Sequence, residues 1–338
     1  MQVYVRVSPF APVQEVVDFT RRCEAAGFDG VGFLDSQMIN RDVFVTMGLA
    51  AAATERISIV SAVTNPVSRH VSTIASAAAT VDDLAPGRVQ IWIGRGFSAV
   101  NLAGLPYASV KQLRESVTSL RGLLRGEWDA ISGVHSKMAI GGRDVPVVLA
   151  AAGPRTLRLA GEVADGVILS GGLVKASLDR VRSLVEEGAR AAGRNPTDVT
   201  LWLNLLTCIR PTREEALRWS GPLLATRLEE PEWLAEAGID THGVQLSEAF
   251  LNLYPDPMHA EDPELAMDLA AELPEELRLQ IAQASGLIGG PEDVLRGIRQ
   301  ARDWGYEHIF MRTVDTMSFP SAEVEAYGAG IGDAVRAM

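Results

Sequence analysis

The sequence is poor in cysteine and histidine. Its two cysteines, Cys23 and Cys208, are too few for a disulfide framework or a cysteine zinc site. Its five histidines are scattered, and none has a partner at metal-ligand spacing, so no metal site is predicted. No apolar run approaches the roughly 18 residues of a membrane span, and no signal peptide is visible ahead of the first strand. We therefore expect a cytoplasmic protein that makes no use of membranes.

Lysine is almost absent from the 338 residues, because only Lys111, Lys137 and Lys175 occur. Lys and Arg together number 31 against 43 Asp and Glu, which gives a net charge of −12. The basic residues form no cluster, and phosphate backbones require concentrated positive charge, so we expect no nucleic-acid partner. Hydrophobic residues make up 47% of the chain, which is enough for a core and excludes a disordered chain.

Short apolar runs alternate with stretches that have helical periodicity. Strands are predicted at Val3–Val7, Gly30–Leu34, Ile57–Val63, Val89–Ile93, Val145–Leu149, Val167–Leu169, Val199–Ile209 and His308–Met311. Helices are predicted at Val13–Ala26, Val43–Ala53, Val71–Leu84, Leu113–Leu124, Thr156–Val163, Leu178–Ala192 and Pro291–Trp304. The strands are nearly all apolar, which is typical of strands buried on both faces. Eight of them favour an α/β (β/α)₈ TIM barrel, and an open doubly wound sheet is the alternative.

One stretch departs from this alternation. About 90 residues separate the seventh and eighth strands, too many for one crossover helix. Helical patterns there cover Glu214–Leu228, Glu232–Ala237, Glu261–Glu272 and Pro274–Ala284. We predict one domain over residues 1–338 with a helical insertion between strands seven and eight, at about 225–285. Because Pro255 and Pro257 restrict the backbone, the loop Asn252–Ala260 is predicted to be an ordered lid that sets substrate choice.

Glycines follow the fourth predicted strand. Gly94-Arg95-Gly96 continues with Phe97-Ser98-Ala99 and formally matches a dinucleotide-binding pattern. That pattern needs an acidic residue at the end of the next strand, and Glu115, at the required distance, lies on a predicted helix. In a barrel the same glycines would let the loop pass close to a flat ligand. A tight turn without a ligand explains the motif equally well.

Two neighbouring strand ends carry small residues ahead of helices. Gly153-Pro154-Arg155 follows strand five and would leave backbone N–H groups free at a helix N-terminus, which suits phosphate. Ser170-Gly171-Gly172 follows strand six and can do the same. An ordinary turn that leads into a helix explains each segment taken alone, but two such segments at neighbouring strand ends favour a phosphate-binding site. Thr64 and Asn65, after strand three, read on chemistry alone as a polar turn before Pro66, and Asp35 reads as a helix cap or a ligand contact.

Taken together and in order, these segments resemble the bacterial luciferase-like superfamily of flavin and deazaflavin oxidoreductases. Within it they most resemble the methylenetetrahydromethanopterin reductase branch. The matching segments are Ala62–Pro66 with Arg69-His70, Ala77–Gly87, Gly94–Gly96, Ala151–Pro154, Ala160–Gly166 and Leu287–Glu292. The resemblance covers most of the chain and weakens over about residues 225–284.

The resemblance implies a TIM barrel that binds coenzyme F420, a deazaflavin, or alternatively FMN, at its C-terminal mouth. A strand-three bulge with a non-prolyl cis peptide, here between Ala62 and Val63, would lie behind the ring. Asp35 would lie near the ring. The cofactor-binding residues that the resemblance implies are Asp35, Ala62, Val63, Thr64, Asn65, Gly94, Arg95, Gly96, Gly153, Pro154, Arg155, Ser170, Gly171 and Gly172.

Two positions depart from the family pattern. Many deazaflavin relatives have histidine where this chain has Ser36, and an acid where it has Phe97. These positions often serve proton transfer or substrate contact. Proton donors would then come from the insertion, from Tyr254, Asp256, His259 or Glu248, although each alone is more commonly a solvated loop residue. Of these, Tyr254 and His259 are the predicted catalytic residues.

Three functions follow from the resemblance. The leading hypothesis is an F420-dependent reductase or dehydrogenase that transfers a hydride to or from a small organic substrate. The alternatives are a luciferase-like monooxygenase that uses reduced FMN and a non-catalytic flavin-binding barrel. We expect a homodimer, and a separate flavin or F420 reductase if the cofactor arrives reduced.

Overall fold

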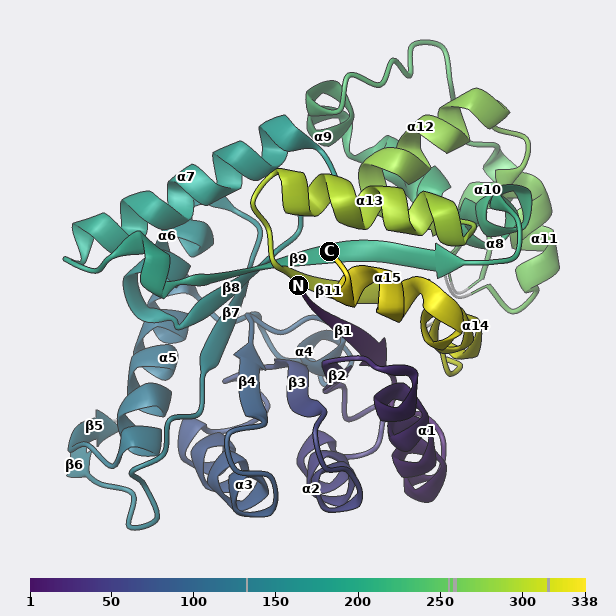
Figure 1. The fold of residues 1–338 in the computed structure, drawn as a ribbon. Coiled ribbons are helices and arrows are strands. Elements are labelled where there is room, and N and C mark those ends of the chain that lie inside the picture. Colours follow the sequence, from purple (N-terminus) through teal and green to yellow (C-terminus); the bar gives the residue numbers. More distant parts are fainter. Residues whose placement is uncertain (132, 255, 258–259, 315–316) are drawn as a thin grey trace.

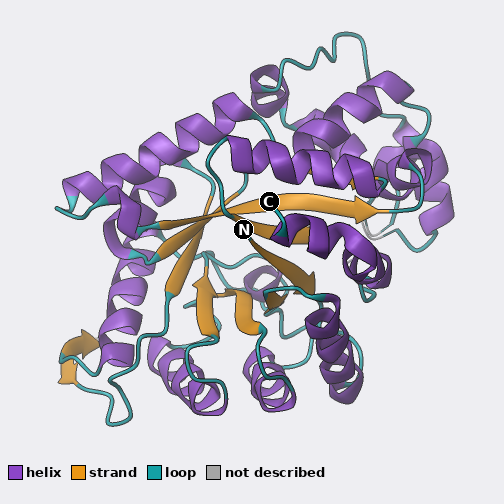
Figure 2. Cartoon of the chain, viewed as in Figure 1, coloured by secondary structure: helices purple, strands orange, loops and turns teal. Residues whose placement is uncertain are grey.

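A computed structural model describes residues 1–131, 133–254, 256–257, 260–314 and 317–338. Eight parallel strands form a closed barrel surrounded by helices (Figures 1 and 2). In spatial order they are β1 (Gln2–Val7), β2 (Gly30–Phe33), β3 (Ser58–Thr64), β4 (Val89–Ile93), β7 (Val147–Ala151), β8 (Gly166–Leu169), β9 (Thr200–Ile209) and β11 (His308–Thr313). Because β8 pairs with β9, β9 with β11, and β11 with β1, the eight strands close into a ring. The predicted TIM barrel is confirmed, and the open-sheet alternative is wrong.

Most helices lie on the outside of this barrel (Figure 2). Those before the insertion are α1 (Val13–Ala26), α2 (Val43–Ala53), α3 (Val71–Leu84), α4 (Ser98–Asn101), α5 (Val110–Arg125), α6 (Pro154–Val163), α7 (Lys175–Ala191) and α8 (Arg213–Ala225). Local sequence sets their limits. Gly27, at φ 91°, ends α1, and Gly126, at φ 72°, ends α5, because these left-handed positions favour glycine. The Asp42 carboxylate begins α2 by accepting hydrogen bonds from Phe44 and Val45 N–H.

Aromatic rings fill the inside of the barrel. Tyr4 packs against Trp202 with ring centroids 4.3 Å apart, and Trp92 packs against Phe310 at 5.0 Å. Gly30 makes room for this layer, since a Cβ there would lie 2.6 Å from the ring of Tyr4. The barrel is therefore packed through its middle, and a ligand can enter only at its ends.

The insertion has helices where helical patterns were predicted, at Glu232–Ala237, Glu261–Glu272 and Pro274–Ala284, and one strand that the sequence analysis missed. The later helices are α9 (Pro231–Glu236), α10 (Glu248–Leu251), α11 (Pro263–Ala270), α12 (Glu275–Ser285), α13 (Pro291–Asp303), α14 (Ser321–Ala326) and α15 (Gly332–Arg336). Figure 1 shows α8, α10 and α11 beyond the arrowhead of β9. The extra strand β10 (Gly286–Gly289) pairs with β9 from Leu206 to Ile209. It forms because β8 covers only Thr200–Leu203 of the longer β9 and leaves the upper part of that edge unpaired.

A small hairpin was also not expected. The strands β5 (Asp129–Ile131) and β6 (Val134–Ser136) pair antiparallel beyond α5. Gly133, at φ 80°, supports the turn between them. No described helix has the length and apolar character needed to cross a membrane.

Candidate functional site

A cavity of about 940 Å³ lies at the carboxyl ends of the barrel strands. Its wall comes from the ends of β1, β2, β3, β4, β7 and β11 and the loops that follow them, together with Leu223 of α8. The predicted cofactor residues that line it are Asp35, Ala62, Val63, Asn65, Gly94, Arg95, Gly96, Gly153, Pro154 and Arg155. Thr64, Ser170, Gly171 and Gly172 are not among its described lining residues.

The end of β3 forms one wall of the cavity. The peptide bond between Ala62 and Val63 is cis, and the register with β4 shifts between Ser61 and Thr64. The bulge and the cis bond are therefore where the resemblance implied. A Cβ built on Gly94 would lie 3.3 Å from Val63 Cγ2 and 3.4 Å from Ala150 Cβ, so the glycine keeps this surface low. Val63, Gly94 and Ala150 thus present small apolar groups to the cavity, a surface on which a flat ring can lie.

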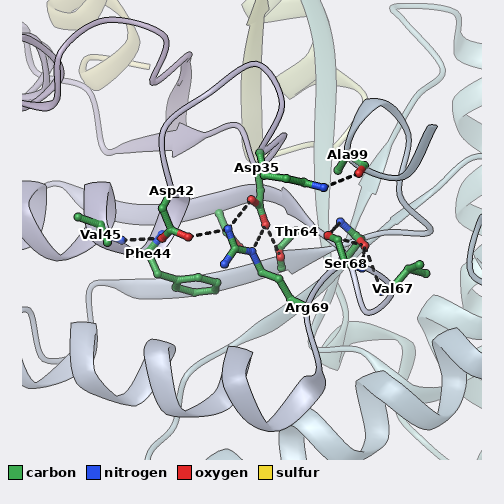
Figure 3. A network of polar contacts seen from close by, with 12 residues as sticks. Asp35, Asp42, Phe44, Val45, Thr64, Val67, Ser68, Arg69 and Ala99 are labelled. Carbon is green, nitrogen blue, oxygen red and sulfur yellow. Dashed lines mark hydrogen bonds and ion pairs between the residues drawn. The ribbon is translucent and has the colours of Figure 1, made fainter. Parts of the chain in front are cut away.

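Asp35 is held by an ion-pair network beside this surface (Figure 3). Its carboxylate accepts hydrogen bonds from Arg69 Nε at 2.8 Å, Arg69 Nη2 at 3.0 Å and Thr64 Oγ1 at 2.7 Å. The same guanidinium donates to Asp42 Oδ2 at 2.9 Å, and Figure 3 shows it between the two carboxylates. Arg69 therefore joins the end of β2, the end of β3 and the start of α2.

This network also shifts proton affinities. Burial alone would raise the pKa of Asp42, but the hydrogen bonds from Val45 N–H and Arg69 outweigh it, and the pKa falls below its usual range. Burial likewise opposes the charge of Arg69, but its two carboxylate partners raise its pKa. Asp35 and Thr64 are consequently committed to each other and to Arg69, so they position the wall. Their predicted contact with the cofactor remains a prediction.

Asn65 lines the cavity but uses its side chain locally. Its Oδ1 accepts from Val67 N–H at 3.0 Å and Ser68 N–H at 2.8 Å, and its Nδ2 donates to Ser68 Oγ at 2.9 Å. This is the polar turn that the chemistry of the sequence favoured.

The loop after β4 needs its second glycine. Gly96 has φ +87°, and a Cβ there would lie 2.7 Å from Val100 Cγ1. Arg95 Nε donates to Ala108 O at 2.7 Å, which holds the loop against the segment before α5. Phe97 follows with its side chain 75% exposed, at the mouth of the cavity. Gly96 is therefore required by the turn itself, whether or not a ligand approaches.

The helix α6 begins at the cavity. Gly153 is its N-cap and Pro154 its first residue, so the N–H groups of the first turn have no partner within the helix. A Cβ on Gly153 would meet only Thr156 Oγ1, at 3.9 Å, which shows open space beside it. Free N–H groups at a helix N-terminus suit a phosphate, and the phosphate-binding role of Gly153, Pro154 and Arg155 remains a prediction.

The loop after β8 packs under the insertion instead. Leu173 N–H donates to Ala284 O at 2.7 Å, and Trp233 Nε1 donates to Gly171 O at 3.1 Å. A Cβ on Gly172 would lie 2.2 Å from Ala284 O, so this glycine allows the close contact. The role predicted for Ser170, Gly171 and Gly172 in phosphate binding remains a prediction.

Of the two predicted catalytic residues, the structure describes only Tyr254. Tyr254 is 73% exposed and is not among the described lining residues. His259, together with Pro255 within the predicted lid, lies outside the described residues. The proposed lid and the catalytic roles of Tyr254 and His259 remain predictions.

Sequence analysis missed two arginines and the environment of Ser36. Arg6 of β1 and Arg312 of β11 line the cavity. Ser36 is 5% exposed, and its Oγ has no hydrogen-bond partner among the described residues. A signal was available, because each arginine interrupts an apolar strand, in Val-Tyr-Val-Arg-Val and Ile-Phe-Met-Arg.

Positive charge dominates this cavity. Its described lining residues include four arginines, Arg6, Arg95, Arg155 and Arg312, and a single carboxylate, that of Asp35. They include no histidine, lysine, glutamate, cysteine or tyrosine. No group of three His, Cys, Asp or Glu side chains that could hold a metal ion occurs in the described part of the chain. The cavity can therefore bind and orient an anionic ligand, but its described wall offers little for proton transfer.

Comparison with known proteins identifies the family. The chain matches the luciferase-like monooxygenase family over residues 2–308 and belongs to that family. It is 33% identical over 198 residues to a 5,10-methylenetetrahydromethanopterin reductase of Methanolobus tindarius, which covers 56% of this chain and 60% of that protein. It is 34% identical over 229 residues to an F420-dependent glucose-6-phosphate dehydrogenase of Beutenbergia cavernae, which covers 62% of this chain and 68% of the relative. The predicted resemblance is confirmed.

Solved structures agree on the fold. The coenzyme F420-dependent tetrahydromethanopterin reductase of Methanopyrus kandleri superposes with a TM-score of 0.78 at 22% identity, over 97% of each chain. This likeness shows that the chain has the fold of that protein over nearly its full length.

Proposed function

We propose that this protein is a coenzyme F420-dependent oxidoreductase that moves a hydride between the deazaflavin and a small organic substrate. One observation carries the proposal. The small apolar surface of Val63, Gly94 and Ala150 lies in the same cavity as the N-terminus of α6. A flat ring with an anionic tail needs such a combination, and relatives over much of the chain carry F420-dependent names.

The chain's own residues would bind the cofactor and orient it. The bound deazaflavin supplies or accepts the hydride. Gly153, Pro154 and Arg155 would hold its phosphate, while Arg69 keeps Asp35 and the end of β3 in place. Exposed apolar side chains at the mouth, Ile39, Phe97 and Met317, would shield the ring from water.

A substrate that needs a proton would receive it from outside the described wall. The Ser36 hydroxyl lines the cavity and has no hydrogen-bond partner among the described residues, but a serine is a weak acid. We therefore keep Tyr254 and His259 as proposed catalytic residues on a lid that closes over the mouth.

Cofactor titration tests this function directly. Purified protein would be titrated with F420 and with FMN by fluorescence, and then tested for transfer of the hydride from reduced F420 to organic acceptors. We expect tighter binding of F420 and no oxygen-dependent turnover. Binding of FMN alone, with oxygen consumption, would favour the monooxygenase, and binding without turnover of any acceptor would favour the non-catalytic barrel.

The variant Gly153→Glu tests the phosphate position. The open space beside Gly153 admits the new side chain, so we expect a folded protein whose F420 affinity falls at least tenfold through charge repulsion. Ser183→Glu is the matched control, because Ser183 is exposed on α7 and outside the cavity. Unchanged F420 affinity in Gly153→Glu would remove the phosphate assignment.

We also infer a homodimer. Val45 and Leu49 of α2 are 60% and 45% exposed, and Leu84 at the end of α3 is 50% exposed. The two helices are neighbours outside the barrel (Figure 1). Adjacent exposed apolar side chains favour a protein interface. We also propose that the enzyme acts in the cytoplasm. If the reaction consumes reduced cofactor, a separate flavin or F420 reductase would supply it.

A further inference from the structure

Arg312 occupies a position on the inner face of the barrel. Phe310, two residues earlier on β11, belongs to the aromatic layer inside the barrel, and side chains alternate along a strand, so Arg312 also points inward. Tyr4 pairs with Phe310 in register, which brings Arg6 of β1 beside Arg312. Both guanidinium side chains line the cavity at its inner end, above the aromatic rings.

The charge of Arg312 has no counter-ion among the described residues. Its Nε is buried and has no hydrogen-bond partner, and it forms no ion pair with any described side chain. Burial, together with the nearby charge of Arg227, lowers the pKa of Arg312 to about 10. Glu230 opposes this effect, but its carboxylate already accepts two hydrogen bonds from Arg227, at 2.9 and 2.8 Å.

The other polar groups near Arg312 do not neutralise its charge. Asp35, the one carboxylate among the described lining residues, is bound in bidentate fashion by Arg69. Asn204, opposite Phe310 on β9, also has a buried Oδ1 without a partner. The Arg312 side chain is half-buried, and a charge that is largely removed from water and lacks a counter-ion is costly. An anion bound in the cavity would supply the missing partner.

We propose that Arg312 binds an anionic group of the substrate, a carboxylate or a phosphate, and so fixes the substrate beside the deazaflavin. This inference rests on the proposed function. The anion belongs to the substrate and not to the cofactor because the phosphate position at α6 follows β7, and β8 and β9 separate β7 from β11 around the barrel. The natural substrate is accordingly an organic acid or phosphate ester, and neutral alcohols and ketones react poorly.

Binding of a simple carboxylate tests the subsite without any cofactor. Benzoate would be titrated into cofactor-free protein by NMR line broadening, for wild type and for Arg312→Met, which keeps a long side chain and removes the charge. We expect at least a tenfold loss of benzoate affinity in Arg312→Met and an intermediate loss in Arg312→Lys. Equal benzoate binding by wild type and Arg312→Met, or none by wild type, would overturn the proposal.

Cofactor and substrate readouts separate this subsite from the proposed function. We expect the F420 affinity of Arg312→Met to stay within twofold of wild type, and its kcat/KM to fall for carboxylate acceptors but not for their methyl esters. Loss of F420 affinity instead would assign Arg312 to the cofactor and overturn the inference. If wild type binds benzoate through Arg312 but binds no F420, the proposed function fails while the subsite stands.

The folding of the variants is checked by thermal melting. Because Arg312→Met removes a buried charge without a counter-ion, we expect its Tm to equal or exceed that of wild type. If Arg312→Met fails to fold, Arg312→Lys carries the test, since a flexible ammonium cannot reproduce bidentate binding of a carboxylate. Wild-type benzoate affinity and wild-type preference for acids over esters in Arg312→Lys would then count against the proposal.

Discussion

Neutralising Asp35 tests how strongly the Arg69 network supports the wall of the cavity. The Asp35 side chain is 2% exposed and accepts three hydrogen bonds, two of them from Arg69. Asp35→Asn keeps the size of the side chain but removes its charge and turns an NH₂ group toward these donors. Breaking a buried ion pair costs about 3–5 kcal/mol. Arg69 keeps Asp42 as a partner and is 17% exposed, so we expect a loss of about 2–3 kcal/mol.

Thermal and urea unfolding provide the measurement. For a large domain about 1 kcal/mol corresponds to roughly 2 °C in Tm, so Asp35→Asn should melt about 4–6 °C below wild type. Asp18→Asn is the matched control, because the Asp18–Arg21 pair at 2.7 Å has both side chains more than half exposed. We expect that variant to stay within about 0.5 kcal/mol of wild type.

A double-mutant cycle assigns the loss to the ion pair. If the pair is responsible, Asp35→Asn together with Arg69→Met should destabilise the protein by less than the sum of the two single variants. Additive losses, or a Tm for Asp35→Asn no lower than that of Asp18→Asn, would refute the reasoning. In that case Asp35 would not be a structural counter-ion, and a direct contact with the cofactor would become the better explanation for its position.

Three further outcomes are expected. Hydrogen bonds from Arg213, Arg296 and Gly290 N–H lower the pKa of Asp293 to about 2. The ionised carboxylate therefore stabilises the folded protein fully above about pH 4, and this contribution disappears as the pH falls towards 2. In urea unfolding, Asp293→Asn should cost about 1 kcal/mol at pH 7 and much less at pH 2. Leu49→Glu should convert a dimer into a monomer in sedimentation at micromolar concentration, whereas an unchanged sedimentation coefficient would exclude α2 from the interface. Tyr254→Ala should leave F420 affinity unchanged and lower turnover, and full turnover would remove its catalytic role.

Most of the barrel could be predicted because its signals are local. Apolar strands such as Val89–Ile93 and a helix limit such as Gly27 depend only on neighbouring residues. The strand β10 carries no such signal, since Gly286-Leu287-Ile288-Gly289 is short and glycine-rich. It is a strand because β9 offers it a free edge, which is a property of the assembled barrel. The hairpin of β5 and β6 was also missed, because its two strands of three residues each are stabilised by pairing with each other.

The candidate site divides in the same way. The bulge at Ala62–Val63 occurs where the family resemblance implied it, and the helix start at Gly153-Pro154 follows a contiguous motif of small residues and proline. The partner of Asp35 could not be deduced, because Arg69 comes from another strand end and meets it only in the folded barrel. The meeting of Arg6 with Arg312 requires closure of the first strand against the last. Contacts between charged residues far apart in the sequence could therefore not be predicted from the sequence alone.

The distribution of charge explains how such a cavity can work in an acidic protein. The chain carries a net charge of −12, yet the described wall of the cavity holds four arginines and one carboxylate that Arg69 already neutralises. A positive cleft in a negative molecule attracts anions to one place and repels them elsewhere. Hydride transfer requires two reactants to be held face to face, and orientation alone can supply much of the rate. The cofactor's phosphate at α6 and the substrate's anionic group at Arg312 would each fix one reactant, from separate parts of the barrel wall. Charge would then provide the orientation, and the apolar surface at Val63 and Gly94 would remain free for the reacting rings.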